Sequence, residues 1–286
     1  MAFMLLASLA VAAMNACVRH VSGELHPFEI AFFRSLFGLA VLAPILIRLG
    51  FAPFRTRKLH VHAVRGALIA ASMMTGFWGL SLVPLAKFTA LFFSAPLFGT
   101  VLAWIALREK VRFPRLVALA VGFAGTLIIL RPGGSGFDPG TVLAVMAAAL
   151  WGVGMIVIKV LARTESNVTI TVYVYLFVTP IAFVAALGFW QTPTIEQLAW
   201  LALIGAFGTT VHMSLAQAFR DADVTAVLPL EFTKLIWASA IGFAAFAEIP
   251  DLWTWVGGGV IFSSAAFIAH HERPGGPGGT SGRDGA

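Results

Sequence analysis

Long apolar stretches alternate with short polar connectors along most of the chain. A run of roughly 20 apolar residues is long enough to cross the hydrocarbon core of a bilayer as a helix. Cutting the sequence at turn-forming and charged residues gives ten such stretches, at 2–21, 27–47, 62–82, 86–107, 115–130, 139–160, 168–189, 196–218, 224–247 and 252–269. This pattern predicts an all-α membrane protein with ten transmembrane helices.

The two ends of the chain differ in character. The first stretch lacks the positively charged segment that precedes the core of a secretory signal, so we expect it to be retained as the first span. A cleaved lipoprotein-like signal that ends at Cys17 is the alternative. The tail, residues 272–286, is rich in glycine and proline, and we expect it to be disordered in the cytoplasm.

The composition agrees with a membrane protein, because 59% of the 286 residues are hydrophobic and only 11% are charged. The net charge of +6 does not indicate nucleic-acid binding, because the basic residues lie in short clusters between the apolar stretches. The single cysteine, Cys17, excludes a disulfide framework within the chain and a cysteine metal site.

Lysine and arginine in the connectors indicate the orientation, because cytoplasmic loops of membrane proteins carry an excess of them. With the N-terminus in the cytoplasm, thirteen of these residues lie on the cytoplasmic side, and only Arg19, Lys87 and Arg131 lie outside. We therefore expect a multi-pass protein of a bacterial-type inner membrane with both termini in the cytoplasm. The remaining cations, Arg34, Arg65 and Lys234, lie within spans.

Three short matches relate the two halves of the chain. VRHV at 18–21 is echoed by IKVL 140 residues later, FTAL at 88–91 by VTAV 136 residues later, and Glu109 by Glu248 139 residues later. Matches in the same order at a nearly constant offset favour duplication of a five-helix unit, at residues 1–132 and 133–271. An odd number of spans in each unit makes the second copy inverted, as in many secondary transporters.

Several motifs resemble those of the drug/metabolite transporter superfamily, in its ten-helix branch with two EamA-type repeats. They are HPFEIAFFR at 26–34, PLAKFTALFFSAPL at 84–97, LREKV at 107–111, GFAGTLIILRP at 122–132 and AEIPDLWTWVG at 247–257. The resemblance implies alternating access to a central cavity lined by the first four spans of each repeat, with the fifth and tenth spans peripheral. One departure is that the second half has no proline to match Pro96 and carries Pro229 earlier in its span.

Charged residues within a span usually face the protein interior, because the bilayer core disfavours them. Arg34 lies seven residues after Pro27, so about 10 Å deep at 1.5 Å per residue. It would bind a carboxylate or phosphate in the cavity, or it would reach the headgroups or pair with Glu29 or Glu24. Glu231 and Lys234 share a helix face three residues apart and follow Pro229; they would form a substrate or proton site or an ion pair with each other.

Other polar and aromatic residues within the spans are weaker candidates for substrate binding. His212, Gln217 and Asn15 would face the cavity or form hydrogen bonds between helices. Candidate cavity aromatics, which would otherwise pack or face lipid, are Trp78, Trp104, Trp151, Tyr173 and Tyr175. We expect no catalytic residues, no metal site and no cofactor. His60, His62, His270 and His271 form pairs, but the sequence places no carboxylate cluster beside them.

These features predict a secondary transporter of a small polar metabolite rather than an enzyme, with the lipid bilayer and a small-molecule substrate as its partners and no nucleic acid. The candidate cations and Glu231 suit an amino acid or an amino-acid-derived, zwitterionic compound. Members that resemble the chain transport S-adenosylmethionine or riboflavin, and these substrates are the alternatives. An intramembrane enzyme or a non-transporting scaffold is the alternative class. The direction of transport, its coupling to protons or exchange, and the oligomeric state stay open.

The orientation can be tested with a reporter at the C-terminus. Because the thirteen-to-three distribution of cations places both termini in the cytoplasm, alkaline phosphatase fused after Ala286 should be inactive and a fluorescent protein there should fluoresce. An active phosphatase at this position would contradict the predicted topology.

Overall fold

The computed structural model describes residues 2–95, 97–99, 101–102, 113–130, 138–161, 164–221 and 233–271, and these residues form helices and no strand. The helices are α1 (Ala2–Val21), α2 (Pro27–Leu49), α3 (Leu59–Leu82), α4 (Leu85–Phe92), α6 (Phe113–Leu130), α7 (Pro139–Leu161), α8 (Asn167–Ala186), α9 (Ile195–Asp221), α11 (Thr233–Phe246) and α12 (Leu252–His271), with short 3₁₀ turns η1 (Ala52–Phe54) and η2 (Leu187–Phe189). Five of them, α1, α2, α3, α7 and α8, are long and apolar enough to cross a membrane, and three shorter apolar helices accompany them in the part of the chain described. The protein has the multi-span all-α fold that the hydropathy pattern predicts.

Local signals fix where α2 begins and ends. His26 caps the first turn by accepting a hydrogen bond from the Phe28 N–H, and Glu29 accepts one from the His26 N–H at 3.3 Å, which forms a capping box. Pro27 occupies the first helical position, where a missing N–H costs nothing. Gly50 ends the helix with φ of +60°, a conformation that favours glycine.

The fourth predicted span, 86–107, is interrupted in the structure. Helix α4 ends at Phe92, and a turn at Phe93 and Ser94 follows, in which the Ser94 hydroxyl donates to the Leu91 carbonyl at 2.7 Å. Helical structure resumes at Ala95 and is present at residues 97–99. The break precedes Pro96, whose ring would clash with the carbonyl four residues earlier in a continuous helix.

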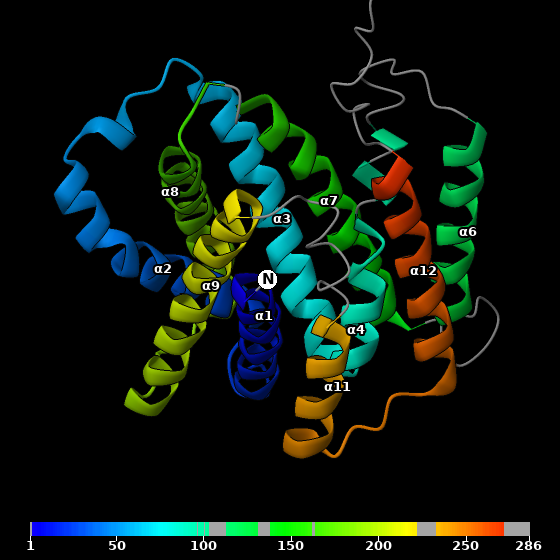
Figure 1. The fold of residues 1–286 in the computed structure, drawn as a ribbon. Coiled ribbons are helices and arrows are strands. Elements are labelled where there is room, and N and C mark those ends of the chain that lie inside the picture. Colours follow the sequence, from blue (N-terminus) through cyan, green and yellow to red (C-terminus); the bar gives the residue numbers. More distant parts are fainter. Residues whose placement is uncertain are drawn as a thin grey trace, which may run out of the picture.

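The helices of the two halves have corresponding neighbours. Helix α3 packs against α7 as α9 packs against α1, and α2 packs against α9 as α8 packs against α3. Helices α2 with α8, α4 with α11 and α6 with α12 pack across the two halves. These pairs are preserved when α1, α2, α3, α4 and α6 are exchanged for α7, α8, α9, α11 and α12. Figure 1 shows α6 and α12 together at one edge, as the resemblance implied for the fifth and tenth spans.

Two close contacts repeat the same symmetry at the level of single residues. A Cβ on Gly66 would collide with Phe177, and a Cβ on Gly205 would collide with Phe37 at 2.6 Å. Gly205 follows Gly66 by 139 residues and Phe177 follows Phe37 by 140. The α3/α8 seam (Gly66, Phe177 and their neighbours) and the α2/α9 seam (Gly205, Phe37 and their neighbours) are therefore equivalent parts of the two repeats.

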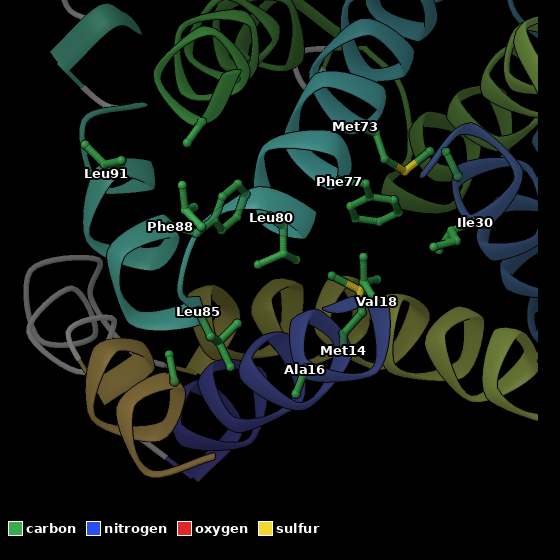
Figure 2. Close-up of a cluster of buried hydrophobic side chains, with 14 of the residues drawn as sticks. Met14, Ala16, Val18, Ile30, Met73, Phe77, Leu80, Leu85, Phe88 and Leu91 are labelled. Carbon is green, nitrogen blue, oxygen red and sulfur yellow. The ribbon is translucent and has the colours of Figure 1, made fainter. Parts of the chain in front are cut away.

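An apolar core joins helices of both halves of the chain. Figure 2 shows Phe77 and Leu80 of α3 facing α1, and Met73 on the side of α2, where its sulfur accepts a hydrogen bond from Arg34. Leu80 is fully buried, and Met73 and Phe77 are nearly so. Burial of this kind within the protein holds α3 at the centre of the bundle, where it contacts α1, α2, α4, α7 and α8.

A polar network closes the end of the molecule where α1, α3 and α11 end, which we name the Glu248 face. Arg19 forms an ion pair with Glu248 at 3.1 Å and donates to the Leu80 carbonyl at 2.8 Å. Glu248 also accepts a hydrogen bond from the Leu85 N–H at 2.8 Å. This network links the ends of α1, α3 and α11 to the start of α4.

The backbone after α11 is shaped to aim Glu248 into this network. Ala247 adopts φ of +54°, which is unfavourable for a residue with a Cβ. The turn lets the Glu248 N–H donate to the Gly242 carbonyl at 3.1 Å, which ends the helix.

Loss of the ion pair should destabilise the fold. Because hydrogen bonds to charged groups contribute about 1.5–3 kcal/mol net, we expect Glu248→Gln to lower unfolding stability by about 1–3 kcal/mol. Thermal unfolding in detergent micelles measures this change. Glu196→Gln, at an exposed position of α9, is the matched control and should unfold like wild type. Equal midpoints for the two variants would show that the network contributes nothing.

Candidate functional site

The guanidinium of Arg34 lies in the protein interior between α2, α3 and α9. Its Nη1 donates to the sulfur of Met73 at 3.2 Å. A Cβ on Gly208 of α9 would lie 3.0 Å from its Nη2, so the absence of a side chain at this position makes room for the cation. Arg34 thus points into the helix bundle, and not to the headgroups.

Neither acid near the start of α2 is paired with Arg34 in the structure. Glu29 is fully buried and accepts hydrogen bonds from the backbone N–H groups of His26 and Gln191. Glu24 accepts one from the Gln197 side chain at 2.6 Å. The ion pairs among the described residues do not include Arg34. The sequence-based alternative that pairs Arg34 with Glu29 or Glu24 therefore has no support in these contacts.

The Nε of Arg34 is buried and has no hydrogen-bond partner within the described residues. A guanidinium carries five N–H donors and no acceptor, and most buried polar groups in proteins are hydrogen-bonded. The thioether sulfur of Met73 is only a weak acceptor. The arrangement is suited to a planar anionic group such as a carboxylate, which two parallel N–H donors can bind.

His212 lies beside this cation on α9. It follows Gly208 by four residues, which places both on one face of the helix. Its side chain is partly buried. Because Gly208 lies against the guanidinium of Arg34, His212 lies one helical turn from this contact, and both residues were indicated by the sequence.

Arg65 is a second buried cation that the sequence analysis placed within a span but did not choose as a site residue. Its side chain is 6% exposed, its Nη1 donates to the Ile170 carbonyl of α8 at 2.9 Å, and its Nε is buried without a partner in the described chain. Arg65 is six residues from the start of α3, much as Arg34 is seven residues from the start of α2. The similar distance of the two arginines from the starts of their helices was the sequence signal that could have identified Arg65 as a site residue.

The other predicted residues lie in different surroundings. Trp78 is 43% exposed and lies near His26 and Phe28, with ring centroids 6.2 and 6.0 Å away. Trp151 lies beside Phe92 of α4, at 6.1 Å. Asn15 is buried in α1. Trp78 and Trp151 therefore contact other residues than Met73 and Gly208, which lie against Arg34.

Two tyrosines in α8 make defined polar contacts. Tyr173 donates its hydroxyl to the Phe54 carbonyl at 2.8 Å and stacks on His62, with ring centroids 4.5 Å apart. Tyr175 is buried, and its hydroxyl lies 3.4 Å from that of Thr209 in the α2/α9 seam. Tyr175 is therefore close to the helices that hold Arg34, and Tyr173 belongs to the α3/α8 seam.

The acid–base pair predicted in the ninth span is only partly within the described residues. Lys234 is partly buried in the first turn of α11. Glu231, Pro229, Trp104 and the side chain of Gln217 lie outside the described residues. Among the residues that are described, no group of three or more His, Cys, Asp or Glu side chains could hold a metal ion.

The chain was compared with known protein families and with individual proteins. It matches the EamA-like transporter family over residues 1–131 and 138–269. The chain is 32% identical over 269 residues to an S-adenosylmethionine uptake transporter of Rickettsia bellii, with 94% of this chain and 92% of the relative covered. It is 33% identical over 276 residues to a riboflavin transporter of Vibrio cholerae, with the same shares covered.

A solved crystal structure gives the same fold, with a TM-score of 0.62 at 20% identity over 94% of this chain and 95% of the other. The two family matches fall one on each half of the chain, and together with the relatives they confirm the resemblance seen in the sequence motifs. This chain belongs to the EamA-like transporter family.

Proposed function

We propose that the protein is a secondary transporter of a small amino-acid-derived zwitterion, whose acid group is bound by Arg34. The family and the named relatives make transport of a small metabolite the function class, and they point away from an enzyme. The observation that carries the substrate proposal is the buried and unpartnered Nε of Arg34.

The charge of the interior supports an acidic group on the substrate. Among the described residues, Arg34 donates to the Met73 sulfur, which is a weak acceptor. Arginine holds a carboxylate in a bidentate fork that lysine cannot reproduce. A carboxylate at Arg34 would satisfy the Nε and compensate the buried charge.

The two relatives transport chemically different compounds, and this difference makes the proposal specific. S-adenosylmethionine carries an amino-acid carboxylate, whereas riboflavin carries no acid group. Because Arg34 is suited to a carboxylate, we take S-adenosylmethionine as the first candidate and riboflavin as the second. The amine and sulfonium of S-adenosylmethionine would need an acid, and Glu231 is the acid that the sequence places within a span.

The proposal keeps the sequence-based expectations for location and architecture. We place the protein in the inner membrane with both termini in the cytoplasm, on the distribution of lysine and arginine between the connectors. We divide it into repeats at residues 1–132 and 133–271, followed by the tail. Counterflow assays with and without a pH gradient distinguish exchange from proton coupling.

Ligand binding to the purified protein is the direct test. A ligand that binds only the folded state adds about 2.7 kcal/mol of stability at 100 times its Kd. We therefore expect S-adenosylmethionine to raise the thermal midpoint and to enter proteoliposomes, with riboflavin inactive. If riboflavin binds the wild-type protein, and binds an Arg34→Gln variant with the same affinity, the carboxylate site is overturned and riboflavin becomes the favoured substrate.

Substitution of Arg34 tests the fork geometry. Arg34→Lys keeps the charge but loses the fork, and because a charged hydrogen bond contributes about 1.5–3 kcal/mol, we expect roughly ten- to a hundredfold weaker binding. Arg34→Gln should bind more weakly still. The matched control is Arg48→Lys at an exposed position of the same helix, which should bind like wild type. Wild-type affinity in Arg34→Lys would end the proposed role of Arg34.

Substitution of Gly208 tests whether the position of Arg34 matters apart from its charge. A Cβ there would lie 3.0–3.2 Å from three guanidinium atoms, so Gly208→Ala should displace the cation. If this weakens one charged hydrogen bond by about 1.4 kcal/mol, affinity falls about tenfold. Gly259→Ala, where a Cβ meets nothing within 4 Å, is the control for the glycine-to-alanine change in a helix. Equal affinities of the two variants would contradict the positioning role.

A further inference from the structure

Each of the two equivalent seams contains one arginine with a buried Nε that has no partner among the described residues. Arg34 belongs to the α2/α9 seam, where its guanidinium lies against Gly208, and Arg65 belongs to the α3/α8 seam, where it contacts Ile170. In each seam a glycine of one helix packs against a phenylalanine of the other. Each seam therefore contains one buried cation, and both cations come from helices of the first half.

His62 adds a second donor beside Arg65. It precedes Arg65 by three residues, so both lie on one face of α3. Its side chain is 1% exposed, and neither ring nitrogen has a hydrogen-bond partner in the described part of the chain. The ring stacks on Tyr173 of α8, so His62 and Arg65 both face the α3/α8 seam. The Nε of Arg65 and the ring nitrogens of His62 are buried polar atoms without partners among the described residues, which indicates a site for an anionic group.

Inverted repeats give the two seams complementary roles in alternating access. When such a transporter changes the side to which it opens, one repeat or bundle rocks against the other around a fixed site. If the two halves exchange conformations in this step, the α3/α8 seam adopts the arrangement that the α2/α9 seam has in this structure, and the α2/α9 seam adopts that of the α3/α8 seam. In the present structure Arg34 is partly buried, whereas Arg65 is only 6% exposed. In the exchanged state the α3/α8 seam would open and Arg65 would become the more accessible cation.

We propose that Arg65 and His62 form a second anion site, to which the acid group of the substrate moves from Arg34 when the α3/α8 seam opens. This rests on the proposed function, because it takes the substrate to be a carboxylate bound first at Arg34. Arg65 Nε and a His62 ring N–H are the donors. The site lies toward the opposite end of the molecule from the Glu248 face, beside η1, which Tyr173 contacts through the Phe54 carbonyl.

Two other roles for Arg65 must be distinguished from this one. Its hydrogen bond to the Ile170 carbonyl also ties α3 to α8, which is a structural role. Glu165 is the acid whose charge acts on His62, and it accepts a hydrogen bond from the Thr56 hydroxyl at 2.7 Å. If Glu165 were the true partner of Arg65 in another state, the two residues would be needed equally.

The test separates binding from movement of the substrate. Binding of S-adenosylmethionine to detergent-solubilised protein and its counterflow in proteoliposomes are measured for wild type, Arg65→Gln, Arg65→Lys and His62→Gln. We expect Arg65→Gln to keep the binding affinity within about threefold but to slow counterflow at least tenfold, because an interaction made only after binding changes turnover and not the initial affinity. Arg65→Lys should recover part of the rate, and His62→Gln should lose less.

Thr56→Val is the matched control for the loss of a structural hydrogen bond in this region, because it removes the side-chain hydrogen bond to Glu165 and leaves all charges in place. It should keep the wild-type rate. Counterflow at the wild-type rate in Arg65→Gln would overturn the second site. Equal slowing in Thr56→Val would assign Arg65 a structural role, and equal slowing in Glu165→Gln would assign it an ion pair. If Arg65→Gln does not fold, Arg65→Lys and His62→Gln decide by the same criteria.

A second measurement does not depend on the substrate. A cysteine at position 62, in a Cys17→Ala background, should react with a membrane-impermeant maleimide from the side opposite the Glu248 face, because the seam opens there. Labelling only after denaturation would overturn the second site even if Arg34 binds the substrate. If wild type fails to bind S-adenosylmethionine but the cysteine reacts, the proposed substrate fails while the opening of the seam stands.

Discussion

The burial of two guanidinium groups within membrane-spanning helices is the constraint on which this structure depends. A charged residue near the centre of a bilayer costs about 2.5–3.5 kcal/mol on insertion scales, and the protein must therefore enclose it. Arg34 and Arg65 are enclosed by helices that come very close to one another, at Gly205 and Gly208 for one and at Gly66 for the other. Close helix contact at small residues is a common means of packing helices in membranes. Here it also sets where the cations lie.

The close helix packing occurs twice in the molecule, once in each seam. Because α2 and α9 meet in the same way as α3 and α8, each seam could take up the conformation of the other under the proposed alternating access. The two seams differ in detail, since Arg34 lies on α2 and Arg65 lies on α3. The cations are thus not copies of a single ancestral residue. The shared feature is the seam, and the first half of the chain supplies the cation to both seams, from α2 in one and from α3 in the other.

Hydropathy and local capping signals were enough to predict most of the fold from the sequence. The spans predicted at 2–21 and 27–47 match α1 and α2 closely, because the connectors contain strong signals such as the capping box at His26 and the left-handed Gly50. The turn at Phe93 and Ser94 could not be predicted from the sequence in this way. Apolar character continues through it, and Pro96 indicated a bend without indicating that the helix would be interrupted.

The candidate site was harder to predict, because the partners of a side chain within a span come from other helices. The sequence could not exclude a pair between Arg34 and Glu29, since only the structure shows Glu29 bound to the backbone N–H groups of His26 and Gln191. Arg65 was passed over for the same reason. Its burial depends on α8, a helix more than 100 residues away in the chain.

Trp78 and Tyr173 illustrate the limit for aromatic residues. Both are amphipathic side chains in long spans, and their sequence positions say nothing about the neighbouring helix. In the structure Trp78 is 43% exposed beside His26, and Tyr173 is bonded to the Phe54 carbonyl. Their role in substrate binding stays a prediction.

The unequal burial of the two arginines also bears on the energetics of transport. In this structure Arg65 is the less exposed of the two, and the Nε of each arginine has no acceptor among the described residues. An unpaired buried charge is costly, whereas a paired and hydrogen-bonded one is much less so. A substrate carboxylate that stays bonded to one arginine and then to the other would lower that cost during the conformational change. Under the proposed function, the loaded protein would therefore change conformation more readily than the empty one, because the ligand can shift the equilibrium only by its differential affinity for the states along the way.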